Sequence, residues 1–486
     1  MADIYGTTTH NLIWLGEEEP YTQSALSAIC AIGEEIREET EDFALLRDML
    51  YDENTYFRYL DSHLKAQYDT SALVSFLYLE WFSRLWVVQE AALSSRNTCC
   101  VGALNIGLDE ILRVVGWLRH KWHHIADDIK DPVGSIFPLF NWADRQHGLF
   151  GSGLRSPEAM DLLIDLRAFH AFDRRDHVFA ILGLLQKHTG SETPVALAAD
   201  YNASLATVLH PATKYIVQER EHLEVLRFVT HRAVENNEDD IASWAPSQHV
   251  AWDGAVDTMG FQGLWHNASA GRKFVTQQLN DEPSILRTTG IAVDSVQNLG
   301  TVWRLASRRD YSIVQLIAEA DALVAGTSAG VANRNAFAAM VLCAGTTESL
   351  TNYQEAEAGA ACLAYTSLKE QWLALPDDEL EPWAQYLSRN DKSATSFAQA
   401  LANASHNRMV FKTTSRYVGL GPQTTRKDDI VAILYGSRWP VVLREFEQYP
   451  GDYEFVGTCY MYGIMNGEAV HEHEASGKEV ETFRLR

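Results

Sequence analysis

One segment between residues 81 and 90 combines residue types that could carry chemistry. It reads Trp81-Phe82-Ser83-Arg84-Leu85-Trp86-Val87-Val88-Gln89-Glu90, in a stretch that is otherwise apolar from Leu73 to Leu93. Trp86 and Glu90 are four residues apart, so on a helix they share one face, with Arg84 on the flank. A carboxylate beside an indole in an apolar helix is unfavourable unless it is paired or takes part in a reaction. Glu90 is therefore either a functional carboxylate or a surface glutamate paired with Arg84 or Arg96, with both tryptophans in the core.

The histidines and cysteines do not form a recognisable metal site. Cys99 and Cys100 are adjacent in sequence, so on a strand their side chains point to opposite faces. His120, His123 and His124 lack the CxxC or HExxH partners that zinc sites use. We predict no metal site and no required cofactor.

Three further motifs are interpreted as structural. The segment Gly419–Pro422 lacks the helix and the lysine that follow in a phosphate loop, so a turn is predicted. His471-Glu472-His473 is interpreted as a solvated tail. Gly463–Ala469 is interpreted as a turn between strands, in which Glu468 is structural rather than catalytic.

Composition limits the class of protein. A chain of 486 residues is long for one hydrophobic core, so about two to four structural units are expected. The net charge of −25 disfavours binding to nucleic acid or to an anionic membrane, because such partners need a basic face. No apolar run is long enough to cross a bilayer, and the six cysteines do not form a disulfide framework. We predict a soluble, cytoplasmic protein with reduced cysteines that binds neither nucleic acid nor membrane.

The pattern of apolar residues and turn signals divides the chain into four predicted segments. Residues 1–125 are expected to form an α/β unit with a partial parallel sheet, and residues 126–235 a helical region. Residues 236–405 mix strands and helices, and from 310 onward the pattern is mostly helical. Residues 406–486 form a small antiparallel β module, with strands over Met409–Thr413, Ile430–Tyr435, Val441–Phe446 and Tyr453–Met461. The fold class expected for the whole chain is α+β.

A short apolar run that ends at Gly16 and the helical spacing of other segments also predict individual elements nearer the amino terminus. They are a strand over His10–Leu15, a helix from Glu17 to about Arg37, a helix over Leu73–Ser94 that carries Glu90, a strand over Thr98–Ile106 and a helix over Asp109–His123. Pro132–Arg155 is interpreted as a connection, and Pro157–Phe172 as a helix. Asp173 is predicted to cap a further helix together with Asp176, and Ser204 to begin another.

The segment from Trp81 to Leu93 resembles the WF-x-R-x-W-x-x-QE signature of the fungal HET (heterokaryon incompatibility) domain family. Four further blocks resemble segments of that family in the same order, so the resemblance covers nearly the whole chain. They are Asp3–Tyr5 with Ile13–Glu17, Asp173–Leu184, Ala199–Tyr201 with Ser243–Pro246, and Tyr417–Pro422 with Tyr460–Ala469. The resemblance implies a protein of self/non-self recognition or regulated cell death.

The HET family is in turn similar to TIR domains, in which a helix bears a tryptophan and, four residues later, a glutamate. Trp86 and Glu90 match that spacing, and His10–Leu15 resembles the strand that precedes the helix. In NAD-cleaving TIR proteins this glutamate binds the ribose on the nicotinamide side. The resemblance therefore implies a TIR-like partial sheet in residues 1–125 and NAD as a substrate. It also implies Glu90 as the catalytic residue, with Trp86 and Arg84 binding the nucleotide.

Two blocks that precede Ile13–Glu17 in the family, an SYxWG-like and a W-x-DA-x-CINQ-like strand, are not found in this sequence. The chain is therefore predicted to be truncated at its amino terminus relative to the family pattern. Strands of this kind help to form nucleotide pockets, so a non-catalytic interaction or scaffold protein with a degenerate HET domain is an alternative. An exposed apolar sheet edge further predicts protein partners or self-association. An accessory protein of fungal secondary metabolism is the remaining alternative.

Overall fold

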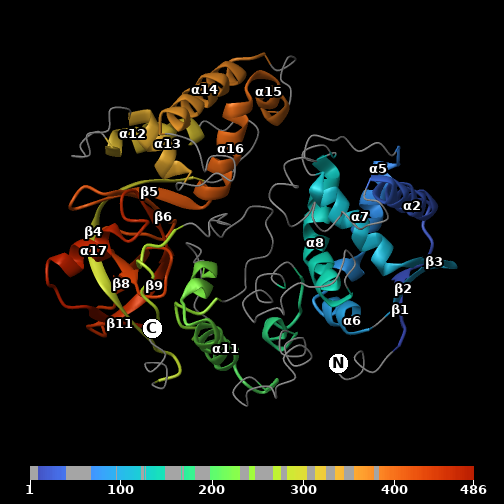
Figure 1. The fold of residues 1–486 in the computed structure, drawn as a ribbon, viewed down its shortest axis with the longest axis horizontal. Coiled ribbons are helices and arrows are strands. Elements are labelled where there is room, and N and C mark those ends of the chain that lie inside the picture. Colours follow the sequence, from blue (N-terminus) through green and yellow to red (C-terminus); the bar gives the residue numbers. More distant parts are fainter. Residues whose placement is uncertain are drawn as a thin grey trace. The chain divides into compact units, whose positions relative to one another are not determined.

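The computed structural model describes residues 9–39, 67–94, 96–121, 125, 127–147, 166, 169–180, 198–229, 240–246, 266–274, 282–303, 312–324, 334–343, 355–376 and 383–486. The chain divides into two compact units, Met1–Asn202 and Ala203–Arg486. Each unit has its own sheet: a small one in the first, and a larger one that closes on itself in the second (Figure 1).

The sheet of the first unit has three strands in the order β1-β2-β3. They are β1 (Asn11–Gly16), β2 (Asn97–Val101) and β3 (Leu104–Gly107). β1 and β2 run parallel, whereas β2 and β3 form an antiparallel hairpin. Successive side chains point to opposite faces, so Ile13, Leu15, Cys99 and Val101 are buried while their neighbours are not. Both predicted strands are confirmed in position, and a turn at Gly102 divides the second one.

Helices pack against this sheet and against one another. α2 (Thr22–Glu39) packs on α5 (Thr70–Leu77) and α7 (Leu108–His120), and α7 contacts β2 and β3. α8 (Asp127–His147) packs against α5, α6 (Val87–Leu93) and α7. The predicted connection from Pro132 is wrong as far as His147, because buried side chains recur at helical spacing there and α8 accommodates two prolines.

The single helix predicted over Leu73–Ser94 is wrong. The segment contains α5, a 3-10 turn η1 (Glu80–Ser83) and α6, with extended backbone at Arg84 (φ −80°, ψ 134°). The extended backbone allows pairing with a distant residue: Leu85 N donates to His170 O at 2.9 Å, and His170 N donates to Ser83 O at 2.7 Å. Helical spacing could not reveal the break, because its cause is a pairing with a residue far along the chain.

The second unit is built around an eight-stranded sheet with the order β10-β6-β5-β4-β11-β9-β8-β7, in which β4 also pairs with β7. The strands are β4 (Leu286–Trp303), β5 (Arg408–Thr413), β6 (Val418–Pro422), β7 (Ile430–Leu434), β8 (Val441–Glu445), β9 (Asp452–Thr458), β10 (Tyr460–Met461) and β11 (Glu481–Leu485). The pairings are antiparallel except that of β11 with β9. The predicted antiparallel β module is therefore confirmed, and β4 joins it from an earlier part of the chain. The turn predicted at Gly419–Pro422 is wrong, because these residues form β6 and pair with β5.

β4 is the strand that closes the barrel-like sheet. Leu286–Gly290 pairs with β11, Gly290–Ser295 pairs with β7, and the remainder of the strand pairs with β5. Gly290 lies where β4 passes from β11 to β7, and a Cβ atom at this position would clash with the carbonyl oxygen of Ile433. The close approach of β7 therefore requires glycine here.

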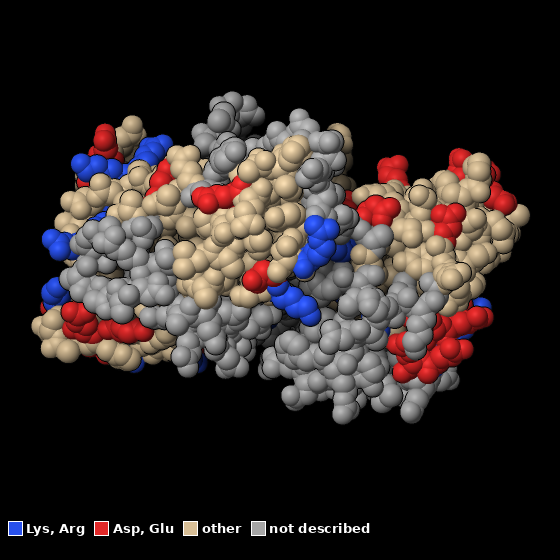
Figure 2. Space-filling view, turned by 90° about the horizontal axis from the view of Figure 1, so that it is seen from above, with Lys and Arg blue, Asp and Glu red and all other residues tan. Residues whose placement is uncertain are grey.

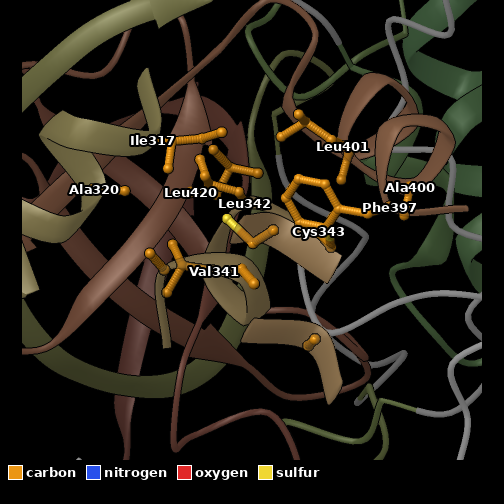
Figure 3. Packing of buried hydrophobic residues seen from close by; sticks show 14 of the residues in the cluster. Ile317, Ala320, Val341, Leu342, Cys343, Phe397, Ala400, Leu401 and Leu420 are labelled. Carbon is orange, nitrogen blue, oxygen red and sulfur yellow. The ribbon is translucent and has the colours of Figure 1, made fainter. Parts of the chain in front are cut away.

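Within the described ranges, five helices lie between β4 and β5 in sequence, as the helical pattern after residue 310 predicted. They are α12 (Ser312–Val324), α13 (Arg334–Leu342), α14 (Glu355–Leu373), α15 (Trp383–Asn390) and α16 (Lys392–Ser405). Their buried side chains pack with those of the sheet: Ile317, Leu342, Phe397 and Leu401 form one core with Leu420 of β6 (Figure 3). A second core of the same unit contains Ile291, Phe411, Val442 and Met461.

Two smaller helices test further predictions. α11 (Leu205–Arg220) begins after Ser204, whose hydroxyl accepts from Thr207 N at 3.2 Å, so the predicted start is confirmed. The turn interpreted over Gly463–Ala469 is confirmed as far as Gly467, where α17 (Glu468–Ala475) begins, and His471 and Glu472 are exposed as interpreted but lie on this helix rather than on a tail. The Glu468 carboxylate accepts from Asn466 N at 2.7 Å, which holds the turn before the helix.

The α+β class is confirmed, while the division into four segments stays a prediction. On the face shown in Figure 2, the acidic side chains of the described residues lie in separate groups among uncharged surface. No helix in the described ranges is long and apolar enough to cross a membrane. The cytoplasmic location and the exclusion of nucleic acid stay predictions.

Candidate functional site

Glu90 lies in the first turn of α6 and is half-buried. Its carboxylate Oε2 accepts a hydrogen bond from the Trp81 indole Nε1 at 3.2 Å. Trp81 itself is buried on η1 and packs edge-to-face against Phe82, with ring centroids 5.3 Å apart. The described part of the chain therefore pairs Glu90 with an indole, and the predicted pairing with Arg84 or Arg96 is wrong.

Trp86 stands on the same helical turn as Glu90, because Glu90 N donates to Trp86 O at 3.2 Å. The Trp86 indole Nε1 donates to Asp176 Oδ2 at 3.2 Å, and the Tyr201 hydroxyl donates to Asp176 Oδ1 at 2.6 Å. Asp176 is buried, and each of its carboxylate oxygens accepts one hydrogen bond from these aromatic side chains, as a buried carboxylate requires. The predicted cap by Asp173 is confirmed, because its Oδ1 accepts from Arg175 N at 3.0 Å at the start of the helical turn. The predicted contribution of Asp176 to the cap is replaced by its bridge between Trp86 and Tyr201.

Arg175 completes the polar part of this cluster. Its guanidinium forms an ion pair with Asp173 at 2.6 Å and donates to Tyr201 O at 2.7 Å. The hydrogen bonds from Arg175 lower the pKa of Asp173 below its usual range. Burial and the hydrogen bond to Asp176 raise the pKa of the Tyr201 phenol to about 12, so the hydroxyl keeps the hydrogen that it donates to Asp176.

Three of the segments that resemble the HET family meet here, although they are far apart in sequence. The segment 81–90 meets 173–180 through the bond of Trp86 to Asp176 and that of Gln89 Nε2 to Ala180 O at 2.9 Å. The segment 199–201 joins them through Tyr201, whose ring also lies edge-to-face on Phe179 at 5.0 Å. We call Trp81, Trp86, Glu90, Asp176 and Tyr201 the aromatic–carboxylate cluster.

The structure brings together only part of the predicted site. Glu90 and Trp86 share a turn but bond to different partners, and Arg84 is exposed with an extended backbone. Sequence reasoning missed Asp176 and Tyr201 as members of the site. The available signal was that both belong to the blocks of family resemblance, which carry polar residues within apolar surroundings.

The position of Glu90 relative to the sheet bears on what it could bind. The Asn11 side chain Nδ2 donates to Glu90 O at 3.4 Å, and the Asn97 side chain donates to Ala91 O at 2.9 Å. Asn11 and Asn97 are the first residues of β1 and β2, so the end of α6 is fixed near the amino ends of the two parallel strands. Moreover, β1 is followed in the chain by α2, so the expected order of a strand leading into the Glu90 helix does not hold.

Within the described residues, no three His, Cys, Asp or Glu side chains gather as a metal site. Cys99 is buried and Cys100 is half-buried on opposite faces of β2, as adjacent strand residues should be. His123 and His124 lie outside the described residues. His120 is buried beside Lys121, and burial lowers its pKa to about 4, which keeps this imidazole neutral.

The Ser243–Pro246 block lies in the second unit and is structural. Trp244 is fully buried, its indole donates to Ser284 O at 3.1 Å, and its ring lies 5.3 Å from that of His210. Ser243 Oγ accepts from Phe455 N of β9 at 2.8 Å, which fastens the block to the barrel-like sheet. The tail segments pair with each other as well, Tyr460 with Leu420 and Met461 with Gly419.

His210 makes the second unit sensitive to acid. Its Nε2 accepts from Ala242 N at 2.9 Å, which requires a neutral ring, and burial with the nearby Lys214 lowers its pKa to about 4. Because the folded pKa of His210 lies below its unfolded value, its contribution to stability is complete above about pH 6.5 and falls as the pH drops toward 4, by up to about 3 kcal/mol.

Denaturant unfolding at pH 7 and pH 4.5 should show this loss of stability. The pKa of His120 is lowered as well, so the pH dependence has more than one source and needs a control. In His210→Gln, the free energy of unfolding should depend less steeply on pH than in the wild type. An unchanged pH dependence would contradict the role given to His210.

Two comparisons show which known proteins the chain is similar to. The family model of the Het-6 β-barrel domain matches residues 348–478. Heterokaryon incompatibility protein 6, OR allele, of Neurospora crassa is 20% identical over 547 aligned residues, which cover 96% of this chain and 78% of that protein. These matches support a fungal HET-type protein. No solved structure matches the chain.

The Het-6 match falls entirely within the second unit. The matched residues include α14 to α17 and β5 to β10, that is, most of the inserted helices and most of the barrel-like sheet. β4 and β11 lie outside the matched range, yet they pair with each other and complete the sheet. The structural module is therefore longer than the matched range at both ends.

Proposed function

We propose that this HET-type protein acts in heterokaryon incompatibility, as a component of self/non-self recognition or regulated cell death, and that Glu90 supports TIR-like cleavage of NAD. The observation that carries the catalytic part is the Trp81–Glu90 hydrogen bond of 3.2 Å beside Trp86. One carboxylate oxygen is held by the buried indole, which fixes the orientation of the other. The similarity to a named incompatibility protein supports the biological role.

The chemistry needs only one well-placed carboxylate. Nicotinamide leaves as a neutral molecule with the electron pair of the broken C–N bond, so no general acid is required. The ionised Glu90 would hold the ribose hydroxyls and stabilise the positive charge that develops at the anomeric carbon. Water then adds to that carbon and releases its proton to solvent, which gives ADP-ribose. An indole next to the carboxylate, as Trp86 is, offers a flat surface for a ring.

Replacing Glu90 by glutamine should abolish NAD loss in cells that express the chain and leave the fold intact. Glutamine keeps the shape of the side chain and its acceptor for the Trp81 indole but removes the charge. The measurement is cellular NAD content together with thermal unfolding of the purified variant. Glu80→Gln, an exposed residue of the adjoining η1 turn, is the matched control and should behave like the wild type. NAD cleavage that persists in Glu90→Gln would exclude this mechanism.

The second candidate is a non-catalytic interaction protein that keeps the HET-type fold. The observation that favours it is the bond from Asn11 to the Glu90 carbonyl at 3.4 Å, which fixes α6 near the amino ends of the parallel strands. Nucleotides bind at the opposite, carboxyl ends in open α/β sheets. A folded wild-type chain that triggers incompatibility without consuming NAD would favour this candidate. A role in secondary metabolism has no structural observation in its favour and stays a prediction.

A further inference from the structure

The first strand of the chain presents an unusual surface. Leu12 and Trp14 lie on the outer face of β1 and are 68% and 56% exposed to solvent, whereas Ile13 between them is 2% exposed. Within the described residues β1 is hydrogen-bonded along one side only, to β2, because the sheet order is β1-β2-β3. In the part of the chain that the structure describes, β1 thus combines a strand edge that pairs with no neighbour and a large exposed indole.

Free edges in soluble proteins are usually protected by charges, prolines or bulges that turn the strand away. β1 has the sequence NLIWLG, which contains neither a charged residue nor a proline. Its one irregularity, between Trp14 and Gly16, lies at the carboxyl end and leaves Asn11–Trp14 in regular register with β2. The edge is therefore able to accept another strand.

We propose that β1 pairs antiparallel with β1 of a second copy of this chain, so that two three-stranded sheets join into one. The occupant is a second copy because the strand is complementary to itself. With Ile13 opposite the partner subunit's Ile13, Leu12 lies opposite the partner subunit's Trp14, and the reverse pair forms by symmetry. Cross-strand aromatic–aliphatic pairs of this kind stabilise antiparallel sheets, and a twofold axis makes the contact closed.

This register also places the buried side chains of both copies on the same side of the joined sheet. Directly opposite residues of an antiparallel pair point to the same side, so the buried Ile13 side chains meet on the core faces of both sheets. A shift by one residue would place the exposed Trp14 opposite a buried residue and would join a core face to an outer face. Only registers that pair buried residues with buried residues therefore keep the two hydrophobic cores on one side of the joined sheet.

Charge favours the antiparallel arrangement as well. Glu17, Glu18 and Glu19 follow β1 directly, and His10 precedes it. Antiparallel pairing places the acidic run of one copy beside the His10 end of the other, whereas parallel pairing would bring the two acidic runs together. Because the whole chain carries a net charge of −25, an arrangement that separates these carboxylates is favoured.

The test is the molar mass of the purified full-length chain, measured by light scattering over a range of concentrations. The wild type should form dimers, and Leu12→Lys should have half the wild-type molar mass, because it puts a charge opposite Trp14 on each side of the axis. Leu363→Lys is the matched control: Leu363 is 52% exposed on α14 of the second unit, and this variant should remain dimeric.

Trp14→Thr, which keeps strand propensity, should also be monomeric. Equal unfolding midpoints would show that all variants are folded. A monomeric wild type, or a dimer that survives Leu12→Lys and Trp14→Thr, would overturn the proposal.

Cross-linking checks the register. In a background with Cys30→Ser and Cys100→Ser, Leu12→Cys mixed with Trp14→Cys should form an intermolecular disulfide on mild oxidation, since opposite Cβ atoms lie within bonding reach. Either cysteine variant oxidised alone should cross-link several-fold less, because identical positions are diagonal neighbours. Equal cross-linking in all three samples would contradict the register, even if the chain is dimeric.

Discussion

Replacing Trp81 by alanine should lower the free energy of unfolding of the first unit by about 3–5 kcal/mol. Trp81 is buried against Phe82 and donates its indole hydrogen to Glu90, so alanine leaves a cavity and removes the partner of a half-buried carboxylate. The loss is comparable to the whole stability of many domains. Denaturant unfolding of the full-length variant, followed by circular dichroism, measures it.

Two further variants separate the contributions at this position. Trp81→Phe keeps most of the ring but removes the N–H donor, so its loss should be clearly smaller. Phe172→Ala is the matched control, because Phe172 is a fully exposed aromatic residue of the same unit and should change stability by less than about 0.5 kcal/mol. If Trp81→Ala unfolds like the control, Trp81 is not a core residue of this unit. Trp86 is half-buried, so alanine there should cost less than at Trp81.

Replacing Trp244 by alanine should destabilise the second unit by about 3–5 kcal/mol. The side chain is fully buried, its indole donates to Ser284 O at 3.1 Å, and its ring packs on His210 with the ammonium of Lys214 5.7 Å from its centre. Alanine would leave a cavity and an unpaired carbonyl oxygen. Thermal unfolding of the variant measures the loss.

Trp244→Phe is the informative control, because it preserves most of the volume and loses only the hydrogen bond to Ser284. We expect a destabilisation of about 1–2 kcal/mol for this variant. Equal effects of phenylalanine and alanine would mean that the hydrogen bond, rather than packing, dominates at this position. No effect of either variant would contradict the burial of the block.

Local sequence pattern predicted those elements whose partners are near in sequence or whose burial alternates regularly. The apolar run over His10–Leu15 identified β1, and the capping residue Ser204 identified the start of α11. The pattern failed where a distant contact decides the backbone. Arg84 is extended because its neighbours pair with His170, and no spacing within residues 73–94 records that contact.

The candidate site shows the same limit. Helical spacing correctly placed Trp86 and Glu90 on one turn, since that relation is local. It could not assign their hydrogen-bond partners, because Trp81 reaches Glu90 only through the break at Arg84, and Asp176 and Tyr201 approach from distant parts of the chain. The family blocks indicated that these segments matter, but not that they touch.

The pairing of β4 with β11 has a consequence for the order in which the chain can fold during synthesis. Leu485 pairs with Leu286, a residue 199 positions earlier, and all five inserted helices lie between them in sequence. While β11 is still within the ribosome, β4 can pair with β5 and β7 but not with β11, so the barrel remains open until β11 has emerged. Its final closure is therefore a late event, and the nascent chain must keep one side of β4 from pairing with other strands until Leu485 emerges.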